Sequence, residues 1–215
     1  GDPQFMKWFT DYMTEYSPDL NSWSVLTYFQ NVVHSIEDAW PDADFRGFLE
    51  RLLLLAETSC YWYYTGEDKW DYQVTNACNH GLDSIGGALN NLASCDCTAP
   101  TIFPPWVTPE NPGGQAWPFE DGHLTPADRV GVVHTFIGDV SGVARATLVL
   151  RAGTTEQKLT MTDWGQYPSK TEARRSAQYY TVQLPVGLGD VRYYVEAEDG
   201  RGNIARSSFE RVHLV

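Results

Sequence analysis

Aromatic and acidic side chains gather in one short stretch of this sequence, where together they have the chemistry needed to hold a sugar. The stretch contains Tyr61, Tyr64, Glu67, Trp70 and Asp71. Aromatic rings can stack on the apolar C–H faces of a pyranose, and carboxylates accept hydrogen bonds from its hydroxyl groups. We therefore predict that these residues form a carbohydrate-binding edge. Trp106 is a further aromatic candidate.

The same stretch has a simpler interpretation as hydrophobic core. Trp62 and Tyr63 lie on the apolar stripes of a predicted helix, so we expect them to pack inside the protein. For Tyr61, Tyr64 and Trp70 the sequence leaves core packing and sugar binding equally open.

Catalytic residues are not apparent in this chain. The acidic pairs Glu37-Asp38 and Glu67-Asp68 are sequence neighbours, whereas glycoside cleavage requires two facing carboxyl groups roughly 5 to 9 Å apart. The sequence contains no GxSxG elbow, phosphate-binding loop or HExxH motif. Five histidines are scattered, at His34, His80, His123, His134 and His213. We expect no catalytic residue in this chain.

The four cysteines fall in the first half of the chain, at Cys60, Cys78, Cys95 and Cys97. A disulfide between Cys60 and Cys78 is sterically plausible across the turn between two predicted helices, and it would imply an oxidising compartment. Reduced cysteines are the alternative, and the sequence does not decide between them. The spacing does not fit a structural zinc site.

Three polar residues in predicted turns have the chemistry to bind calcium. They are Asp139, Asp199 and Asn203. Hydrogen bonds within the turns explain them more simply. We therefore predict neither a metal nor a cofactor.

Charge is distributed unevenly along the 215 residues, whose formal net charge is -13. Residues 1–97 contain 4 Lys and Arg against 15 Asp and Glu, while the remainder is close to neutral. The contrast suggests two units, and the acidic first half makes nucleic acid an unsuitable partner. The sequence predicts no membrane span. Its start, GDPQFMKWF, does not resemble a signal peptide, and we expect a mature or excised piece of a longer protein.

Hydrophobic periodicity predicts about four helices in residues 1–97, arranged as an antiparallel bundle. The expected helices cover residues 2–16, 21–40, 45–64 and 75–92. The third is apolar over most of its circumference, with Leu52, Leu55 and Trp62 on one stripe. Such a helix is normally surrounded by others, so we expect it to lie at the centre of the bundle.

The second half of the chain has the residue pattern of β-strands. Residues 98–126 are rich in proline and aromatic residues, which favours an ordered connector over a flexible linker. Residues 127–215 contain short alternating segments separated by Gly, Asn and Asp turns. We therefore predict an α+β multidomain chain in which the bundle is followed by an immunoglobulin-like β-sandwich of about seven strands.

Two groups of motifs follow one another along the chain. The first consists of residues 57–64 (ETSCYWYY), Trp70-Asp71 and residues 76–79 (NACN), and the second of residues 98–105 (TAPTIFPP), 111–114 (NPGG), 139–143 (DVSGV) and 193–199 (YYVEAED). The first group resembles the helical region that follows the catalytic barrel in glycoside hydrolase family 57, in its amylopullulanase-like branch, and the second is similar to the sandwich that trails it. The resemblance covers most of the chain and rests on the shared order of the motifs.

The resemblance implies hydrolysis or transfer at α-linked glucans by two carboxyl groups on a barrel, and those residues have no counterpart here. We expect the non-catalytic C-terminal region of an extracytoplasmic enzyme that supports its barrel and contributes to α-glucan binding. The expected partner is that barrel, in the same or a processed parent chain. The alternative is a secreted or cell-surface interaction module that binds a protein or a polysaccharide.

Overall fold

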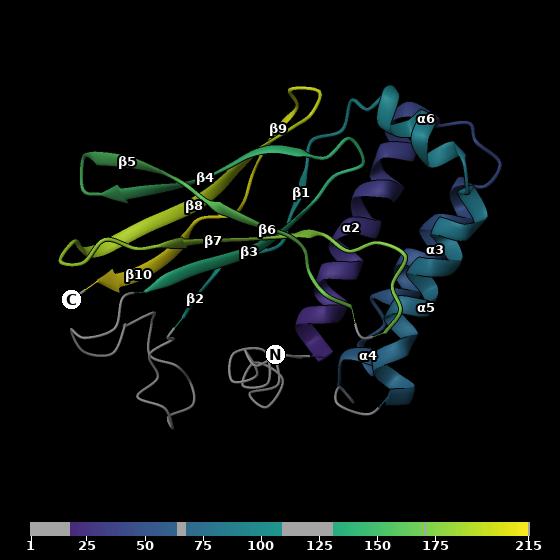
Figure 1. Ribbon diagram of the computed structural model, residues 1–215, viewed down its shortest axis with the longest axis horizontal. Helices are drawn as coiled ribbons and strands as arrows, with labels where there is room; N and C mark the ends of the chain where they lie inside the picture. The colour runs from purple at the N-terminus through teal and green to yellow at the C-terminus, as the bar shows by residue number, and fades with distance from the viewer. Residues whose placement is uncertain (1–17, 64–67, 109–130, 170, 215) are drawn as a thin grey trace.

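The computed structural model describes residues 18–63, 68–108, 131–169 and 171–214 (Figure 1). Within these ranges the chain forms five helices and ten strands, and the strands make two antiparallel sheets. The predicted α+β class is confirmed. None of the described helices is long and apolar enough to cross a membrane.

The helices follow the predicted order with changed boundaries. They are α2 (Pro18–Ala39), α3 (Arg46–Ala56), α4 (Ser59–Tyr63), α5 (Asp68–Ile85) and α6 (Ala88–Ser94). The helix expected over residues 2–16 lies outside the described residues. The helix expected over residues 75–92 begins earlier and is broken in two, because Gly86 takes a φ of 46° that ends α5.

The central helix is α2, not the helix that follows it. Leu26, Phe29, Val33 and Ile36 recur at helical spacing and are all buried. One side of α2 packs on α3 and α5 and the other on β3, so α2 lies between the remaining helices and a sheet (Figure 1). The expectation that α3 is surrounded is wrong, because only one face of it is buried, and Leu55 on the predicted inner stripe is 44% exposed.

Each sheet contains five strands. The first has the order β1-β3-β7-β6, with β2 also paired to β3, and the second has the order β10-β8-β4-β5, with β9 also paired to β8. The strands of the first sheet are β1 (Thr101–Ile102), β2 (Trp106–Thr108), β3 (Val132–Gly138), β6 (Thr162–Gln166) and β7 (Gln178–Gln183). Those of the second are β4 (Val143–Ala152), β5 (Thr155–Thr160), β8 (Gly189–Asp199), β9 (Ile204–Arg206) and β10 (Glu210–Leu214).

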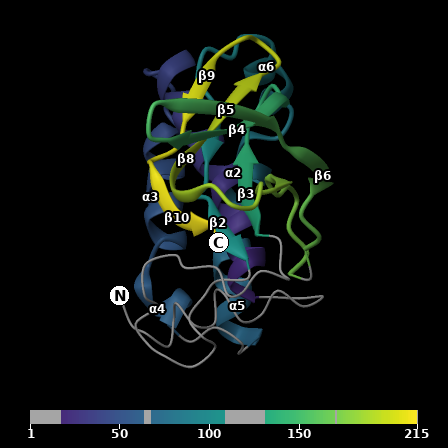
Figure 2. The same ribbon diagram turned by 90° about the vertical axis from the view of Figure 1, so that its left-hand side faces the viewer.

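Two hydrophobic cores hold three layers together. The first contains the buried faces of the helices together with Trp106, Phe136 and Ala177 from the first sheet and its flank. The second fills the space between the sheets, with members such as Ile137 and Leu148. Figure 2, turned to face the strands, shows them in front of the helices. The described helices therefore complete their core on the first sheet, which differs from the self-contained bundle predicted.

Close contact within the helical layer requires glycine at one position. A Cβ added at Gly81 of α5 would lie 2.3 Å from the Phe29 ring, which is itself fully buried. Gly81 therefore lets α5 approach α2, which explains a residue that weakens a helix.

The segment between β6 and β7 crosses back to the helices. Thr171 is 1% exposed, accepts a 2.8 Å hydrogen bond from Asn21 Nδ2 of α2, and lies 2.5 Å, oxygen to oxygen, from Thr75 of α5. Asn79 Oδ1 accepts a 2.8 Å hydrogen bond from the Arg174 backbone N–H. These bonds attach the first sheet to both helices.

The connector and the polar segment beyond β4 both contain strands. Within the expected connector, β1 and β2 pair with β3 over residues 101–108, and residues 109–126 lie outside the described residues. The polar segment at residues 152–177 contains β5 and β6, which the prediction missed. Both are edge strands, and nearly every side chain of β5 is exposed, so neither carries the apolar alternation of a core strand.

Candidate functional site

The structure brings together two of the predicted sugar-binding aromatics. Tyr61 of α4 and Trp70 of α5 are both half-buried, and their ring centroids lie 6.1 Å apart. The Lys69 ammonium lies 5.3 Å from the Trp70 ring. Tyr64 and Glu67 fall outside the described residues. The paired rings therefore form a small, partly accessible aromatic surface where the two helices meet.

The structure places the other two candidates in the interior. Asp71 and Trp106 are each 5% exposed. The Trp106 ring stacks on His134 at 5.4 Å and lies 5.4 Å from Phe136. A sugar would have no access to either face of this indole, so we leave Trp106 out of the sugar-binding surface considered below.

Trp62 belongs to the core, as predicted. Its ring is 6% exposed and stacks on Trp23 with centroids 4.0 Å apart. Its Nε1 donates a 3.0 Å hydrogen bond to the Ala56 carbonyl, which satisfies the one polar group of the indole.

An exposed tryptophan that the sequence analysis missed lies on the edge strand β6. Trp164 is 66% exposed, and its Nε1 donates a 2.9 Å hydrogen bond to Thr181 Oγ1. Asp163 Oδ2 accepts hydrogen bonds from Gln178 Nε2 at 2.8 Å and from the Tyr180 hydroxyl at 3.2 Å. Thr181 therefore fixes the indole at one end, whereas Asp163 and its partners Gln178 and Tyr180 occupy the alternate positions of the two strands and face the other side of the sheet. A tryptophan within the polar run DWGQ was the available signal.

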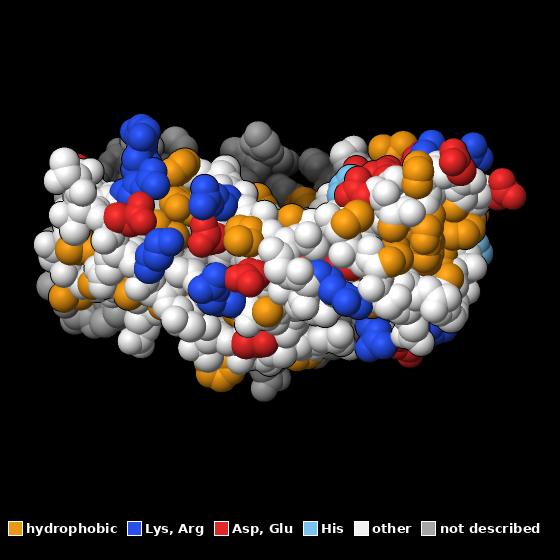
Figure 3. Space-filling view, turned by 90° about the horizontal axis from the view of Figure 1, so that it is seen from above, with side chains coloured by type: hydrophobic (Ala, Val, Ile, Leu, Met, Phe, Trp, Pro, Cys, Tyr) orange, Lys and Arg blue, Asp and Glu red, His pale blue; other side chains and the backbone are white. Residues whose placement is uncertain are grey.

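The outer face of α3 exposes several large apolar side chains. Phe48 is 40% exposed, Leu54 is 68% exposed and Leu55 is 44% exposed. Figure 3 shows hydrophobic side chains gathered at the helical end of the molecule. We call these three residues the α3 apolar face. Scattered apolar residues are normal on a protein surface, but several on consecutive turns of one helix are typical of a contact surface.

All four cysteines are free in the structure. Cys60 is exposed on α4 whereas Cys78 is buried in α5, so the predicted Cys60–Cys78 disulfide is not formed. Burial raises the pKa of the Cys78 thiol, which keeps it protonated and unreactive.

The acidic residues of the predicted turns make the local bonds expected of them. Asp139 Oδ1 accepts hydrogen bonds from Ser141, and Asp199 accepts them from Arg201 and Asn203. The structure also brings Asp139 and Asp199 together with Asp96 in a buried group. No long polymer could reach carboxylates that are at most 7% exposed, so this group is unsuited to glucan hydrolysis.

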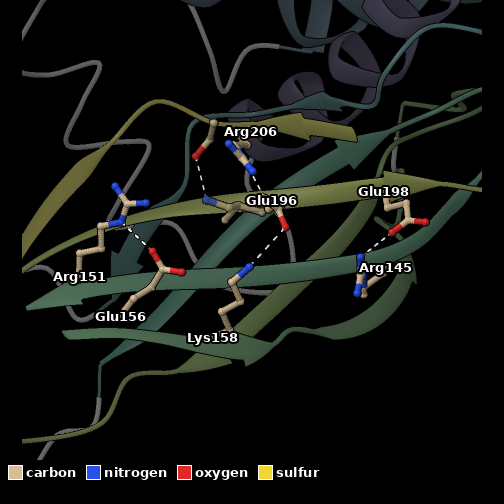
Figure 4. A network of polar contacts seen from close by, with 9 residues as sticks. Arg145, Arg151, Glu156, Lys158, Glu196, Glu198 and Arg206 are labelled. Carbon is tan, nitrogen blue, oxygen red and sulfur yellow. Dashed lines mark hydrogen bonds and ion pairs between the residues drawn. The ribbon is translucent and has the colours of Figure 1, made fainter. Parts of the chain in front are cut away.

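The outer face of the second sheet carries charges that neutralise one another (Figure 4). Glu196 contacts Arg206 at 2.8 Å and Lys158 at 3.9 Å, and the Arg206 hydrogen bond is the main reason that the pKa of Glu196 is lowered. Two further pairs are Arg145–Glu198 at 2.5 Å and Arg151–Glu156 at 3.0 Å. These contacts pair four basic side chains with three acidic side chains.

Comparison with known proteins does not assign this chain to a family. No protein-family model matches the chain, and no curated protein matches it. Among solved structures, a cycloalternan-degrading enzyme from Trueperella pyogenes, in complex with cycloalternan, is 16% identical with a TM-score of 0.30. The match covers 40% of this chain and 14% of that protein, so this is a weak and partial structural neighbour.

Proposed function

We propose that this chain is the non-catalytic C-terminal region of an α-glucan-active glycoside hydrolase, and that its helical layer docks against the catalytic barrel. In this proposal the two sheets form the trailing immunoglobulin-like sandwich, and the protein works outside the cytoplasm. The observation that most supports this proposal is the α3 apolar face. The sequence motifs that resemble family 57 suggest that a catalytic barrel covers that face.

The α3 apolar face is better suited to contact with another domain than to exposure to solvent. Leu54 and Leu55 lie on the side of α3 opposite the buried Leu49 and Leu53. Fully burying a leucine contributes about 1.5 to 3 kcal/mol. Leu54 and Leu55 are 68% and 44% exposed, so covering both would contribute about 2 to 3 kcal/mol to the contact with a barrel.

Changing Leu54 and Leu55 together to glutamine is expected to weaken binding of the catalytic barrel at least about tenfold. The barrel to use is the one encoded with this chain, expressed separately and titrated by calorimetry. The stability of the isolated chain should change by less than about 0.5 kcal/mol per site, because both side chains are exposed.

Val186→Gln is the matched control, since Val186 is 64% exposed and lies among the strands, away from α3. Equal affinity of the double variant and the wild type would exclude the α3 apolar face as the docking surface. If no barrel is encoded in the same chain or a partner chain, the alternative of a secreted or cell-surface interaction module replaces the proposal.

Carbohydrate binding is a second proposed role, and the exposed indole of Trp164 favours it. Trp164 presents an accessible aromatic ring whose position is fixed by its hydrogen bond to Thr181, and a pyranose can stack on such a ring. The surface formed by Tyr61 and Trp70 is the other site on which a glucan would stack.

Replacing Trp164 by alanine is expected to weaken α-glucan binding about two- to tenfold, because one aromatic contact contributes about 0.5 to 1.5 kcal/mol. Affinity electrophoresis in gels containing soluble starch or pullulan measures the change, with Trp70→Ala run alongside. Phe209→Ala is the control, since Phe209 is 52% exposed in the segment between β9 and β10. Unchanged mobility of the wild-type chain on both polysaccharides would overturn the carbohydrate role.

A further inference from the structure

Three buried aspartates come together where the helical layer meets both sheets. Asp96 follows α6, Asp139 lies in the turn between β3 and β4, and Asp199 ends β8. One carboxylate oxygen from each lies within 4.8 Å of the other two. Their exposed fractions are 7%, 6% and 1%. We call these residues the aspartate cluster.

The aspartate cluster holds negative charge that no nearby basic side chain balances. Among the described residues, no lysine or arginine forms an ion pair with any of the three. Charge buried without a partner is strongly unfavourable, so either a proton or a cation must neutralise part of it.

Two carboxylate oxygens of the aspartate cluster have no hydrogen-bond donor among the described residues. Oδ2 of Asp96 and Oδ2 of Asp139 are buried and accept no hydrogen bond from any residue that the structure describes. The other oxygens are held by the backbone: Asp96 Oδ1 accepts from the Thr98 N–H at 3.0 Å, and Asp139 Oδ1 from the Ser141 N–H at 2.8 Å. A buried carboxylate with one anchored oxygen and one unused oxygen is ready to bind a ligand.

Contacts between the three loops fix the position of the aspartates. Asn31 of α2 donates to the Ala99 carbonyl at 3.2 Å and accepts from the Val140 N–H at 2.8 Å, so it ties the loop after Asp96 to the turn that contains Asp139. The Gly200 N–H donates to the Gly142 carbonyl at 2.8 Å. Arg201 Nε donates to the Ala93 carbonyl at 3.2 Å, which completes the connections.

We propose that Asp96, Asp139 and Asp199 bind one calcium ion, which joins the helical layer to both sheets. The ligands are hard carboxylate oxygens, which select calcium or magnesium over zinc and copper. Calcium is favoured because it accepts six to eight oxygens in flexible geometry, whereas magnesium retains several waters that a buried position has to accommodate. Backbone carbonyls and water would supply the remaining ligands.

The test uses the full 215-residue chain, treated with a chelator and then dialysed. Calorimetric titration with calcium chloride is expected to show one ion bound per chain. Saturating calcium should raise the thermal unfolding midpoint by about 5 °C or more, because an ion that binds only the folded state stabilises it. Magnesium at the same concentration should have a smaller effect.

The variants Asp96→Asn and Asp139→Asn should each lose the calcium-dependent rise in the midpoint. Asp42→Asn is the matched control, because it removes the same charge from an exposed position and should respond like the wild type. No effect of calcium on the wild type, combined with a higher midpoint for Asp139→Asn, would overturn the proposal in favour of a shared proton. An equal response in all variants would also overturn it, by placing the ion elsewhere.

Discussion

Replacing Gly138 by alanine is expected to lower the free energy of unfolding by at least about 3 kcal/mol, because the added methyl group has no space. Gly138 ends β3 where this strand crosses α2. A Cβ built there would lie 2.7 Å from Tyr28 Cα and 2.8 Å from the Thr27 carbonyl oxygen. Both atoms belong to the backbone of a buried helix, so relief requires α2 and the first sheet to move apart. Urea denaturation followed by circular dichroism measures the change.

Gly47→Ala is the control for this prediction. Gly47 is an exposed residue of α3, and a Cβ there would meet no atom within 4 Å. Alanine is up to about 1 kcal/mol more favourable than glycine in a helix, so the change should be neutral or stabilising. A Gly138→Ala protein as stable as Gly47→Ala would show that the helical layer and the first sheet do not meet as described.

The residues that the sequence predicted best are those whose position depends on local periodicity. In α2 the apolar residues recur with the 3.6-residue period of a helix. The burial of Leu26, Phe29 and Ile36 can therefore be predicted from their spacing. In α3 nearly every position is apolar, and periodicity cannot identify the buried side. Leu55 was therefore predicted to be inside although the structure exposes it.

The candidate sites were harder to predict because they depend on contacts between distant segments. Asp96 and Asp199 are separated by most of the sheet region, and only the packing of α6 against the β8–β9 turn brings them together. Trp106 was a sugar-binding candidate as an aromatic residue of the proline-rich connector. It is buried because β2 pairs with β3 and places the indole against His134.

The protein is expected to lose about 2 kcal/mol of stability between pH 7 and pH 5 through His134 alone. Burial lowers the pKa of His134 to about 4, from an ordinary value of 6.5. Its ring lies nearly parallel to those of Trp106 and Tyr179, with centroids 5.4 and 5.9 Å away, and Nδ1 lies 2.5 Å from the Tyr179 hydroxyl. Between pH 6.5 and pH 4 the unfolded chain therefore binds a proton that the folded chain excludes. The stabilisation is fully present above pH 6.5 and is lost as the pH falls toward 4.

Other groups also titrate in this range, so the measurement is a difference between proteins. Urea denaturation at pH 7 and pH 5 is compared for the wild type, His134→Gln and His80→Gln. Glutamine cannot gain a proton, so His134→Gln should lose about 2 kcal/mol less than the wild type on acidification. His80 is exposed on α5, and its replacement should leave the wild-type pH dependence in place. Equal losses of stability in the wild type and in His134→Gln would show that burial does not keep His134 neutral. In that case β2 and β3 would pack less tightly around His134 than the ring contacts indicate.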